Sequence, residues 1–219
     1  MLVAIKHGVR MRPVLITAGA TRNRIDAMRF ISAHSSGRTG AHIAEALNPH
    51  RVLLLGSPEA CLRASERVQT ATYGDTMDLM QMMKDWISLH PDGIVVHASA
   101  VGDYMADPSD ASSQGKLPSG QPELSLRLVP TPKILDQLKD WSADIFLASF
   151  KAAPPHTDAA GLEQLARAQA TRTSSDLVFA NTIGQLTTEV VVLDQERAVT
   201  HSTRDGAIDH LIQRISSMR

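Results

Sequence analysis

Short runs of aliphatic residues recur along the chain, and longer segments with a helical spacing of apolar positions separate them. The runs contain few polar residues, which is typical of strands that are buried on both faces of a sheet. They predict strands over residues 14–18, 52–56, 94–98, 145–148 and 177–180. Two further apolar segments, 190–193 and 198–200, flank a polar turn and predict a hairpin.

Amphipathic segments lie between most of these strands. Apolar residues at three- and four-residue intervals predict helices over 37–47, from Asp75 or Thr76 to His90, from a Thr131 cap through Leu138, over 158–172, and around Ile208–Ile215. Strand and helix therefore alternate along the chain. This order predicts an α/β fold, Rossmann-like and doubly wound, with a mostly parallel sheet.

One segment interrupts the alternation. Residues 105–130 are rich in proline and glycine, and Leu124, Leu126 and Leu128 then alternate with polar residues. This pattern predicts a small β flap that ends in a half-exposed strand. We therefore expect a single domain over residues 1–219, with an extension at 1–11 and a flap-like insertion at 105–130, a size that allows a real hydrophobic core.

Composition narrows the class of protein. The 22 basic and 23 acidic residues nearly cancel, and aromatic residues make up 4% of the chain, so neither charge nor stacking favours nucleic acid or an anionic membrane as a partner. No apolar run reaches the length of a membrane span. The one cysteine excludes an internal disulfide, and the nine histidines show no metal-ligand spacing. We expect a cytoplasmic protein without a metal site of its own.

Small residues follow the predicted strands, at the sheet edge where α/β proteins bind ligands. They occupy residues 17–22, 99–104, 149–151 and 180–182, and residues 35–37 form a Ser-Ser-Gly turn before a helix. Exposed backbone amides in such turns hold phosphate oxygens, although tight turns without a ligand have the same composition. No G-x-G-x-x-G follows the first strand, so a dinucleotide enzyme is a poor fit.

Five motifs in order resemble the phosphopantothenate–cysteine ligase family, also called phosphopantothenoylcysteine synthetases. They are LITAGATRNRIDAMRFISAHSSGRTG (15–40), HASAVGDY (97–104), GKLPSGQPELSLRLVPTPKILDQLKDW (115–141), SFK (149–151) and DLVFAN (176–181). No flavin-binding decarboxylase domain precedes them, so the stand-alone form is expected. The resemblance implies that 4′-phosphopantothenate and cysteine are joined through an acyl-nucleotidylate, with ATP or CTP as cosubstrate and Mg²⁺ as cofactor, in a homodimer.

The resemblance also implies roles for individual residues. Lys116 and Asp103 match the residues expected to be catalytic. The positions that match substrate-binding residues are Arg29, Ser35, Ser36, Gly37 and Asn181. The positions that match nucleotide-binding residues are Gly19, Ser99, Ala100, Asp103, Lys116, Pro132, Lys133, Ile134, Leu135 and Phe150. Taken alone, each has a structural alternative: a surface ion pair for Arg29, a turn or cap for Asp103, a solvated side chain for Lys116 and core packing for Phe150.

The chain departs from the family pattern at several positions. Ala33 stands where the family has an asparagine that serves the cysteine step, and Ala153 stands where many members have a glutamate. Gln169 and Thr173 stand where two-domain relatives have lysines that bind phosphate, and Lys151 is the candidate to take their place. Three hypotheses therefore stand: a ligase that forms phosphopantothenoylcysteine, a ligase that uses another amine, and a non-catalytic binding protein.

Overall fold

An eight-stranded sheet forms the centre of the protein. The computed structural model describes residues 11–47, 51–109, 116–117, 120, 122–184 and 189–218. The strand order is β12-β11-β10-β9-β6-β1-β4-β5, and only the last two strands of the chain run antiparallel to their neighbours. The strands are β1 (Val14–Ala18), β4 (Val52–Gly56), β5 (Gln69–Thr72), β6 (Ile94–His97), β9 (Phe146–Ala153), β10 (Leu177–Thr182), β11 (Val190–Asp194) and β12 (Ala198–His201). The predicted mostly parallel α/β fold is confirmed.

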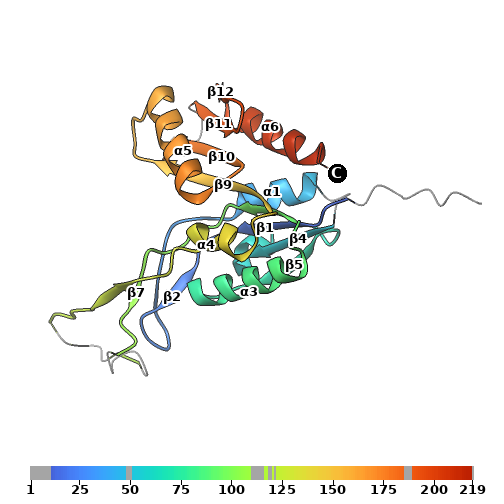
Figure 1. Cartoon of the computed structure of the whole chain (residues 1–219). Coiled ribbons are helices and arrows are strands. Elements are labelled where there is room, and N and C mark those ends of the chain that lie inside the picture. The colour runs from blue at the N-terminus through green and yellow to red at the C-terminus, as the bar shows by residue number, and fades with distance from the viewer. Residues whose placement is uncertain are drawn as a thin grey trace, which may run out of the picture.

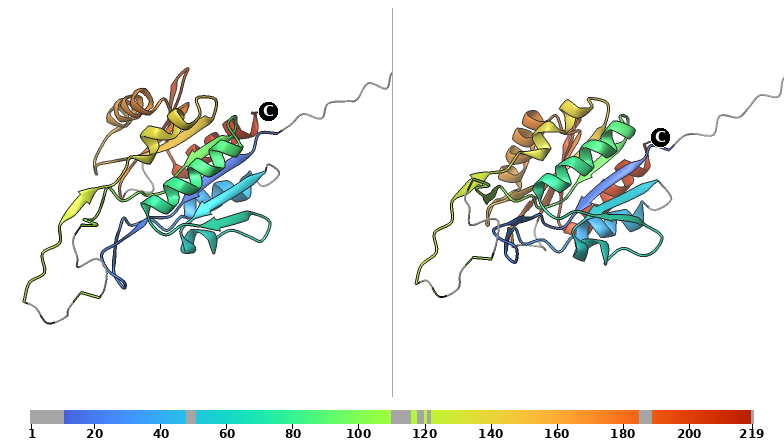
Figure 2. Two further views of the ribbon diagram at one scale, coloured as in Figure 1. Left: turned by 60° about the horizontal axis from the view of Figure 1, so that its bottom comes forward. Right: turned by 90° about the horizontal axis from the view of Figure 1, so that it is seen from below.

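Helices cover both faces of this sheet, as Figures 1 and 2 show. On one face lie α1 (Arg38–Ala46), α2 (Pro58–Cys61) and α6 (Arg204–Ser216), and on the other lie α3 (Thr76–Leu89), α4 (Ile134–Trp141) and α5 (Ala159–Thr173). Successive residues of β1 serve the two cores: Ile16 packs with the α1–α6 side, and Leu15 packs with the α3–α4 side. This arrangement follows from the period-two alternation of side chains along a strand.

Helix starts follow from local capping chemistry. Asp75 caps α3 with a reciprocal capping box to Asp78, and Asp158 accepts the backbone N–H of Gly161 at the start of α5. The predicted cap of α4 was wrong by two residues, because Lys133 occupies the N-cap position. The hydroxyl of Thr131 instead donates to the carbonyl of Gly102 at 2.6 Å, which ties the segment before α4 to the loop after β6.

Two short antiparallel hairpins extend from the carboxyl edge of the sheet. One pairs β2 (Arg22–Arg24) with β3 (Phe30–Ser32), and the other pairs β7 (Tyr104–Ala106) with β8 (Leu128–Pro130). Figure 1 shows the second pair at the base of an arm that leaves the body of the protein. The predicted strand begins only at Leu128, because the residues from Leu124 to Arg127 have no strand to pair with in the described part of the chain.

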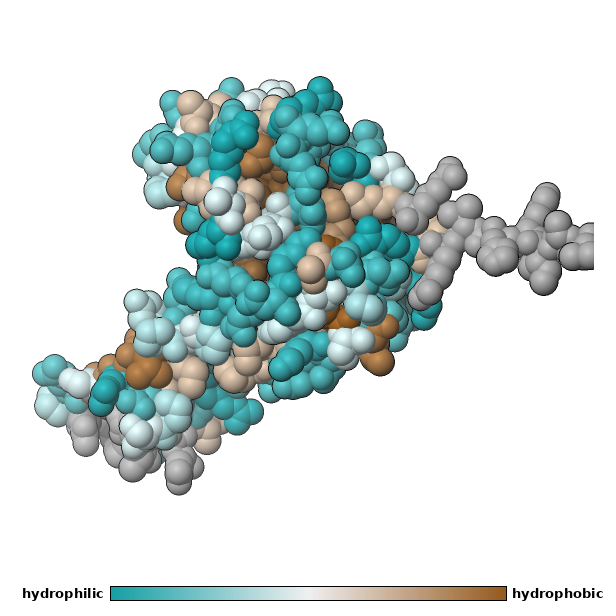
Figure 3. All heavy atoms as spheres, viewed as in Figure 1, coloured by the Kyte–Doolittle hydropathy of each residue, from teal (hydrophilic) through white to brown (hydrophobic). Residues whose placement is uncertain are grey.

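Hydrophobic atoms gather on part of the surface of the arm, which Figure 3 shows as a brown patch. Tyr104, Leu124 and Leu128 are between 41% and 53% exposed. None of the helices in the described ranges is long and apolar enough to cross a bilayer. The extension predicted at residues 1–11 lies outside the described residues except for Met11.

Candidate functional site

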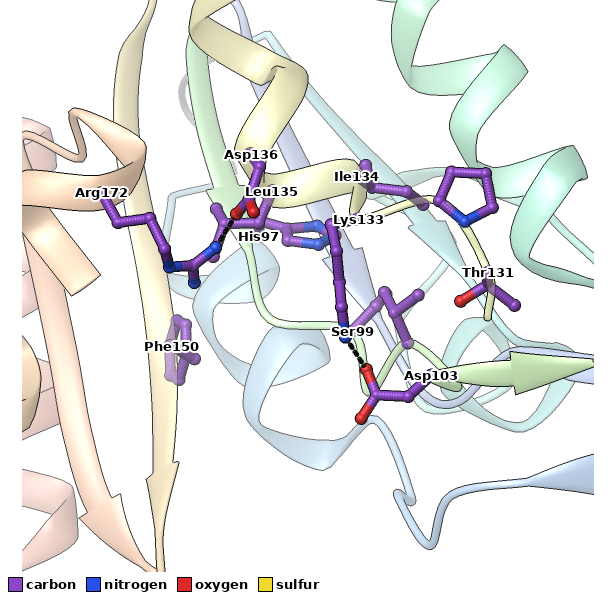
Figure 4. A pocket seen from close by; sticks show the side chains of 12 residues that line it. His97, Ser99, Asp103, Thr131, Lys133, Ile134, Leu135, Asp136, Phe150 and Arg172 are labelled. Atoms are coloured by element: carbon purple, nitrogen blue, oxygen red, sulfur yellow. Dashed lines mark hydrogen bonds and ion pairs between the residues drawn. The ribbon is translucent and has the colours of Figure 1, made fainter. Parts of the chain in front are cut away.

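A cavity of about 230 Å³ lies beyond the carboxyl end of β6, beside α4 and β9. The crevice at this edge of a doubly wound sheet is where such folds bind ligands. Figure 4 shows the side chains that line the cavity, which come from the loop after β6, the start of α4, the middle of β9 and the end of α5. They are His97, Ser99, Val101, Asp103, Thr131, Pro132, Lys133, Ile134, Leu135, Asp136, Phe150 and Arg172.

Two ion pairs cross this cavity. The ammonium of Lys133 contacts the carboxylate of Asp103, and the guanidinium of Arg172 contacts the carboxylate of Asp136 (Figure 4). The side chains of Lys133 and Asp103 are 58% and 65% exposed. Exposed ion pairs contribute little net stability because water screens them. An anionic ligand can therefore displace the carboxylates at low cost and take both cations.

The floor of the cavity is neutral and hydrogen-bonded. His97 is buried at the end of β6, and its Nδ1 lies 2.9 Å from the hydroxyl oxygen of Thr17. That oxygen also accepts the backbone N–H of Ser99 at 3.2 Å, and because a hydroxyl can donate once and accept twice, its bond with Nδ1 fits either tautomer of the ring. Burial lowers the pKa of His97 to about 4, so the ring is uncharged near pH 7.

Tyr73, the residue after β5, supports the same floor. Its hydroxyl donates to the carbonyl of Ala18 at 2.8 Å and lies 2.9 Å from the hydroxyl of Ser99. Burial raises the pKa of Tyr73 to about 12, so the phenol stays protonated. These contacts hold Ser99 in place between β1 and β6.

Phe150 forms the wall of the cavity on the β9 side. The prediction that residues 149–151 follow a strand was wrong, because β9 continues to Ala153 and pairs with β10 from Ala148 to Ala153. Phe150 stacks on Phe179, with ring centroids 4.8 Å apart, and Gln169 donates to the carbonyl of Phe150 at 3.3 Å. Ala153 is fully buried in the core that β9 shares with α5.

The first turn after β1 lies next to the cavity without lining it. Gly19 has a positive φ of 86°, and a Cβ atom there would lie 2.2 Å from the Oγ of Ser57. Glycine is therefore required at this close approach. The backbone N–H of Ala100 donates to the carbonyl of Gly19 at 2.8 Å, so both residues shape the loop after β6 from below.

Asp26 and Arg29 join the first hairpin to the flap. Asp26 accepts the backbone N–H groups of Met28 and Arg29 at 2.8 and 2.7 Å, and that of Leu117 at 3.0 Å. These hydrogen bonds, that of Leu117 foremost, lower the pKa of Asp26. Arg29 pairs with Asp26 at 3.6 Å and donates to the carbonyl of Leu117 at 3.1 Å. We name this group the Asp26 clamp; it fixes the chain next to Lys116, whose side chain is exposed.

A second cavity, of about 540 Å³, lies between α1 and α6. Ser36 lines it, after Ser35 and before Gly37, which adopts a positive φ of 71° at the N-cap of α1. The other lining residues are Arg38, Thr39, His42, Arg204, Asp205, Ile208 and Asp209. Asn181 lies within β10, beyond the predicted end of that strand, and donates to the carbonyl of Thr182 at 3.1 Å. It lines neither cavity.

The structure thus gathers most of the residues predicted for the nucleotide and separates the others. Seven predicted residues line the first cavity: Ser99, Asp103, Pro132, Lys133, Ile134, Leu135 and Phe150. Lys116 and Arg29 lie at the flap, and Ser36 lines the second cavity. Sequence reasoning missed His97, Asp136 and Arg172 as cavity residues; the cation from α5 is Arg172, beside the positions 169 and 173 where lysines were expected.

The chain matches one protein family over most of its length. Residues 9–217 match the family model described as DNA/pantothenate metabolism flavoprotein C-terminal domain. The chain is 36% identical over 193 residues to the coenzyme A biosynthesis bifunctional protein CoaBC of Thermococcus kodakarensis, covering 84% of this chain and 45% of that protein. It is 28% identical over 183 residues to CoaBC of Escherichia coli K12, covering 80% and 42%. The chain therefore spans less than half the length of these curated relatives.

Two solved structures share the fold. The DNA/pantothenate metabolism flavoprotein from Streptococcus pneumoniae superposes with a TM-score of 0.80 at 24% identity, covering 94% of this chain and 99% of that one. A Cab2 mutant in complex with phosphopantothenate-cysteine superposes with a TM-score of 0.75 at 20% identity, covering 94% and 85%. At these identities, the likeness shows the fold.

Proposed function

Because the chain belongs to the DNA/pantothenate metabolism flavoprotein C-terminal domain family, we propose that it is a ligase of coenzyme A biosynthesis that joins 4′-phosphopantothenate to cysteine. The observation that carries this proposal is the first cavity. It places two displaceable cations, Lys133 and Arg172, on either side of a hollow with one aromatic wall, Phe150. Such a site suits a nucleotide, since the ring can contact the base or ribose and the cations can contact the phosphates.

The proposed reaction has two steps. In the first, a carboxylate oxygen of 4′-phosphopantothenate attacks the α-phosphorus of ATP or CTP, an acyl–O–P bond forms, and pyrophosphate leaves. In the second, the cysteine amine attacks the acyl carbon, loses a proton and forms the amide, and the nucleoside monophosphate leaves. Cations and oriented amides accelerate the first step by stabilising the charge that develops on the leaving pyrophosphate.

The residues of the chain have separate parts in this scheme. Lys133 and Arg172 would exchange their carboxylate partners for nucleotide phosphates, which leaves Asp103 and Asp136 free to contact other polar groups of the ligands. The Asp26 clamp would hold the flap at Leu117, so that the neighbouring Lys116 is presented to the phosphates. His97 stays neutral and keeps the loop of Ser99 in place, as a positioning residue.

Mg²⁺ fits the proposal as a partner of the nucleotide. Among the residues that the structure describes, no group of three or more His, Cys, Asp or Glu side chains could hold a metal. Mg²⁺ is commonly held by substrate phosphates and one or two carboxylates, and Asp103 and Asp136 are carboxylates at the first cavity. When bound, the ion would neutralise charge on the triphosphate.

The amine that accepts the acyl group is the least constrained part of the proposal. Ala33 is exposed between β3 and the Ser-Ser-Gly turn, and its side chain has no donor for an acyl carbonyl. A ligase that uses a different amine is therefore the second candidate. It requires the same first step and a different product.

A homodimer is also part of the proposal. Large apolar side chains are exposed on the two neighbouring hairpins, with Met28 and Phe30 on the first and Tyr104 and Leu128 on the second. The hairpins are joined by a hydrogen bond from Asn23 to the carbonyl of Tyr104, at 2.8 Å. Exposed large apolar side chains on neighbouring elements are typical of a protein–protein interface.

Pyrophosphate release tests the proposal directly. The protein is incubated with 4′-phosphopantothenate, Mg²⁺ and either ATP or CTP, with and without cysteine, and the products are identified by mass spectrometry. Formation of phosphopantothenoylcysteine supports the ligase. Release that halts at the acyl-nucleotidylate supports the first step and a different amine, and absence of release with both nucleotides would refute the proposal.

A further inference from the structure

Arg204 is a partly buried cation at the start of α6 whose side chain is held on two sides. Its guanidinium lies over the ring of Phe179, 5.1 Å from the ring centroid, and donates to the hydroxyl of Thr39 at 3.2 Å. Phe179 is fully buried and cannot move aside. A planar guanidinium that rests on an aromatic face in this way is fixed in orientation before any ligand arrives.

The charge of Arg204 is not balanced by an ion pair. In the described ranges of the chain, no carboxylate lies within 4.0 Å of its nitrogens, although eight other ion pairs form there. Burial lowers the pKa of Arg204, and the charge of Asp205 offsets this effect only in part. A charged group that is removed from water gains most from a partner of opposite charge.

The guanidinium borders the cavity of about 540 Å³ between α1 and α6. Ser36 and Thr39 supply hydroxyl groups to the same cavity, and Arg38 supplies a second cation. Two carboxylates, Asp205 and Asp209, also border it, but both residues are exposed, so water screens their charge more strongly than that of Arg204. The cavity therefore offers a fixed cation and hydroxyl donors, which together suit a tetrahedral oxyanion.

We propose that the cavity between α1 and α6 binds a phosphate group and that Arg204 fixes it. Phe179 connects the two cavities. Its ring contacts Arg204, which lines the second cavity, and stacks on Phe150, which lines the first. A phosphate at Arg204 would thus lie one aromatic pair away from the nucleotide. The proposed function supplies two phosphate-bearing molecules, the nucleoside triphosphate and 4′-phosphopantothenate, and the inference rests on it only for their identity.

Binding, measured by isothermal titration calorimetry without turnover, tests the inference. The full chain and its Arg204→Met variant are titrated with inorganic pyrophosphate, with ATP, and with 4′-phosphopantothenate. Methionine keeps apolar contact with Phe179 and removes the charge. We expect the variant to bind pyrophosphate and one of the two substrates about ten- to a hundredfold more weakly, which is the usual effect of losing a charge-assisted hydrogen bond. The affected substrate identifies the source of the phosphate.

Two further variants separate charge from folding. Arg204→Lys keeps the charge without the planar fork and should recover part of the affinity. Arg214→Met, on the same helix but paired with Asp194 at 3.8 Å, should bind like the unchanged protein. Unchanged affinity of Arg204→Met for all three ligands would overturn the inference, as would failure of the unchanged protein to bind any of them. Phosphate binding that depends on Arg204 in a protein without ligase activity would uphold the inference and refute the proposed function.

Discussion

The carboxylate of Asp26 accepts the backbone N–H of Leu117 at 3.0 Å, across 91 residues of sequence. This bond ties the flap to the β2–β3 hairpin, and Arg29 strengthens the tie by donating to the carbonyl of Leu117. The flap is thereby anchored one residue after Lys116. Because Leu117 is adjacent to Lys116, the clamp limits how far Lys116 can move from the β2–β3 hairpin.

Replacing Asp26 with asparagine tests this anchor. We expect Asp26→Asn to loosen the flap, because an amide lacks the charge and one of the two acceptor oxygens that hold three backbone N–H groups. Limited proteolysis within residues 107–127 should become about tenfold faster, the size of change expected when one such bond is lost from a local opening equilibrium. The KM for nucleotide should rise with it.

Asp158→Asn is the matched control. Asp158 also accepts a backbone N–H, that of Gly161 at 2.8 Å, but it lies at the start of α5, outside the flap. Equal proteolysis of Asp26→Asn and the unchanged protein would show that the clamp does not hold the flap. The pKa of Asp26 is lowered, so its contribution to stability is complete above the usual pKa of an aspartate and is lost as the pH falls through the lowered value.

Because of the buried His97, we expect a second pH dependence of the free energy of unfolding. Its pKa in the folded protein is about 4, below the unfolded value of 6.5, so the unfolded chain binds more protons between these values and acid favours unfolding. We expect His97 to remove about 3 kcal/mol of the free energy of unfolding between pH 7 and pH 4. Urea denaturation at several pH values measures this loss.

His97→Asn isolates that effect from the carboxylates that titrate in the same range. The asparagine oxygen can accept from the hydroxyl of Thr17 in place of Nδ1, and it does not titrate. The stability of the variant should therefore fall less steeply with acid than that of the unchanged protein. Parallel curves for the two proteins would contradict the buried, neutral assignment.

The sequence predicted the parts of the fold that depend on continuous burial. Four strands consist almost entirely of buried side chains: β1, β4, β6 and β10. Such continuous apolar runs can be predicted without knowledge of the neighbouring strands. β5 (Gln69–Thr72) was missed because it is a mostly polar strand at the sheet edge, next to β4 only. The β2–β3 hairpin was missed for a related reason, since three-residue strands carry too little periodicity to detect.

In the candidate site, too, some residues were predicted from the sequence and others were missed. Residues 99–104, which follow β6, were expected at the ligand-binding edge because the carboxyl ends of parallel strands meet there. Residues 132–135 were expected beside the nucleotide only from the family resemblance, and the structure brings residues of both segments to the first cavity. Arg172 was missed because its relevance depends on the rotation of α5: Gln169 and Thr173 face the sheet and are buried, whereas Arg172 projects toward α4. The contact between Asp26 and Leu117 depends on tertiary pairing that no local pattern encodes.

Arg172 provides a third prediction. Arg172→Met should weaken nucleotide binding about three- to thirtyfold, because the variant loses one exposed, charge-assisted contact with a phosphate. Stability should change little, since the pair with Asp136 is exposed on both sides. The affinity for ATP and CTP can be measured by calorimetry and the stability by thermal unfolding.

Arg167→Met is the control on the same helix. Arg167 pairs with Glu163 one turn earlier, at 2.7 Å, and does not line the cavity. Its replacement should leave nucleotide affinity unchanged. Equal affinities for Arg172→Met and Arg167→Met would remove Arg172 from the proposed nucleotide site.

Ala33 provides the last prediction, on the cysteine step. Ala33→Asn introduces an amide donor where the resembling family has one, in an exposed segment that can accept a larger side chain without repacking the core. If the acyl group reaches this position, the donor should accelerate amide formation, by up to the order of 10²–10³ that one preorganised donor supplies. Pyrophosphate release in the absence of cysteine should not change.

Quenched-flow sampling with mass spectrometry separates the two steps, and His34→Asn tests whether a donor at the adjacent exposed position has the same effect. Equal rates of amide formation in the Ala33→Asn variant and the unchanged protein would show that another group polarises the carbonyl, and a product only with a different amine would favour the second candidate function.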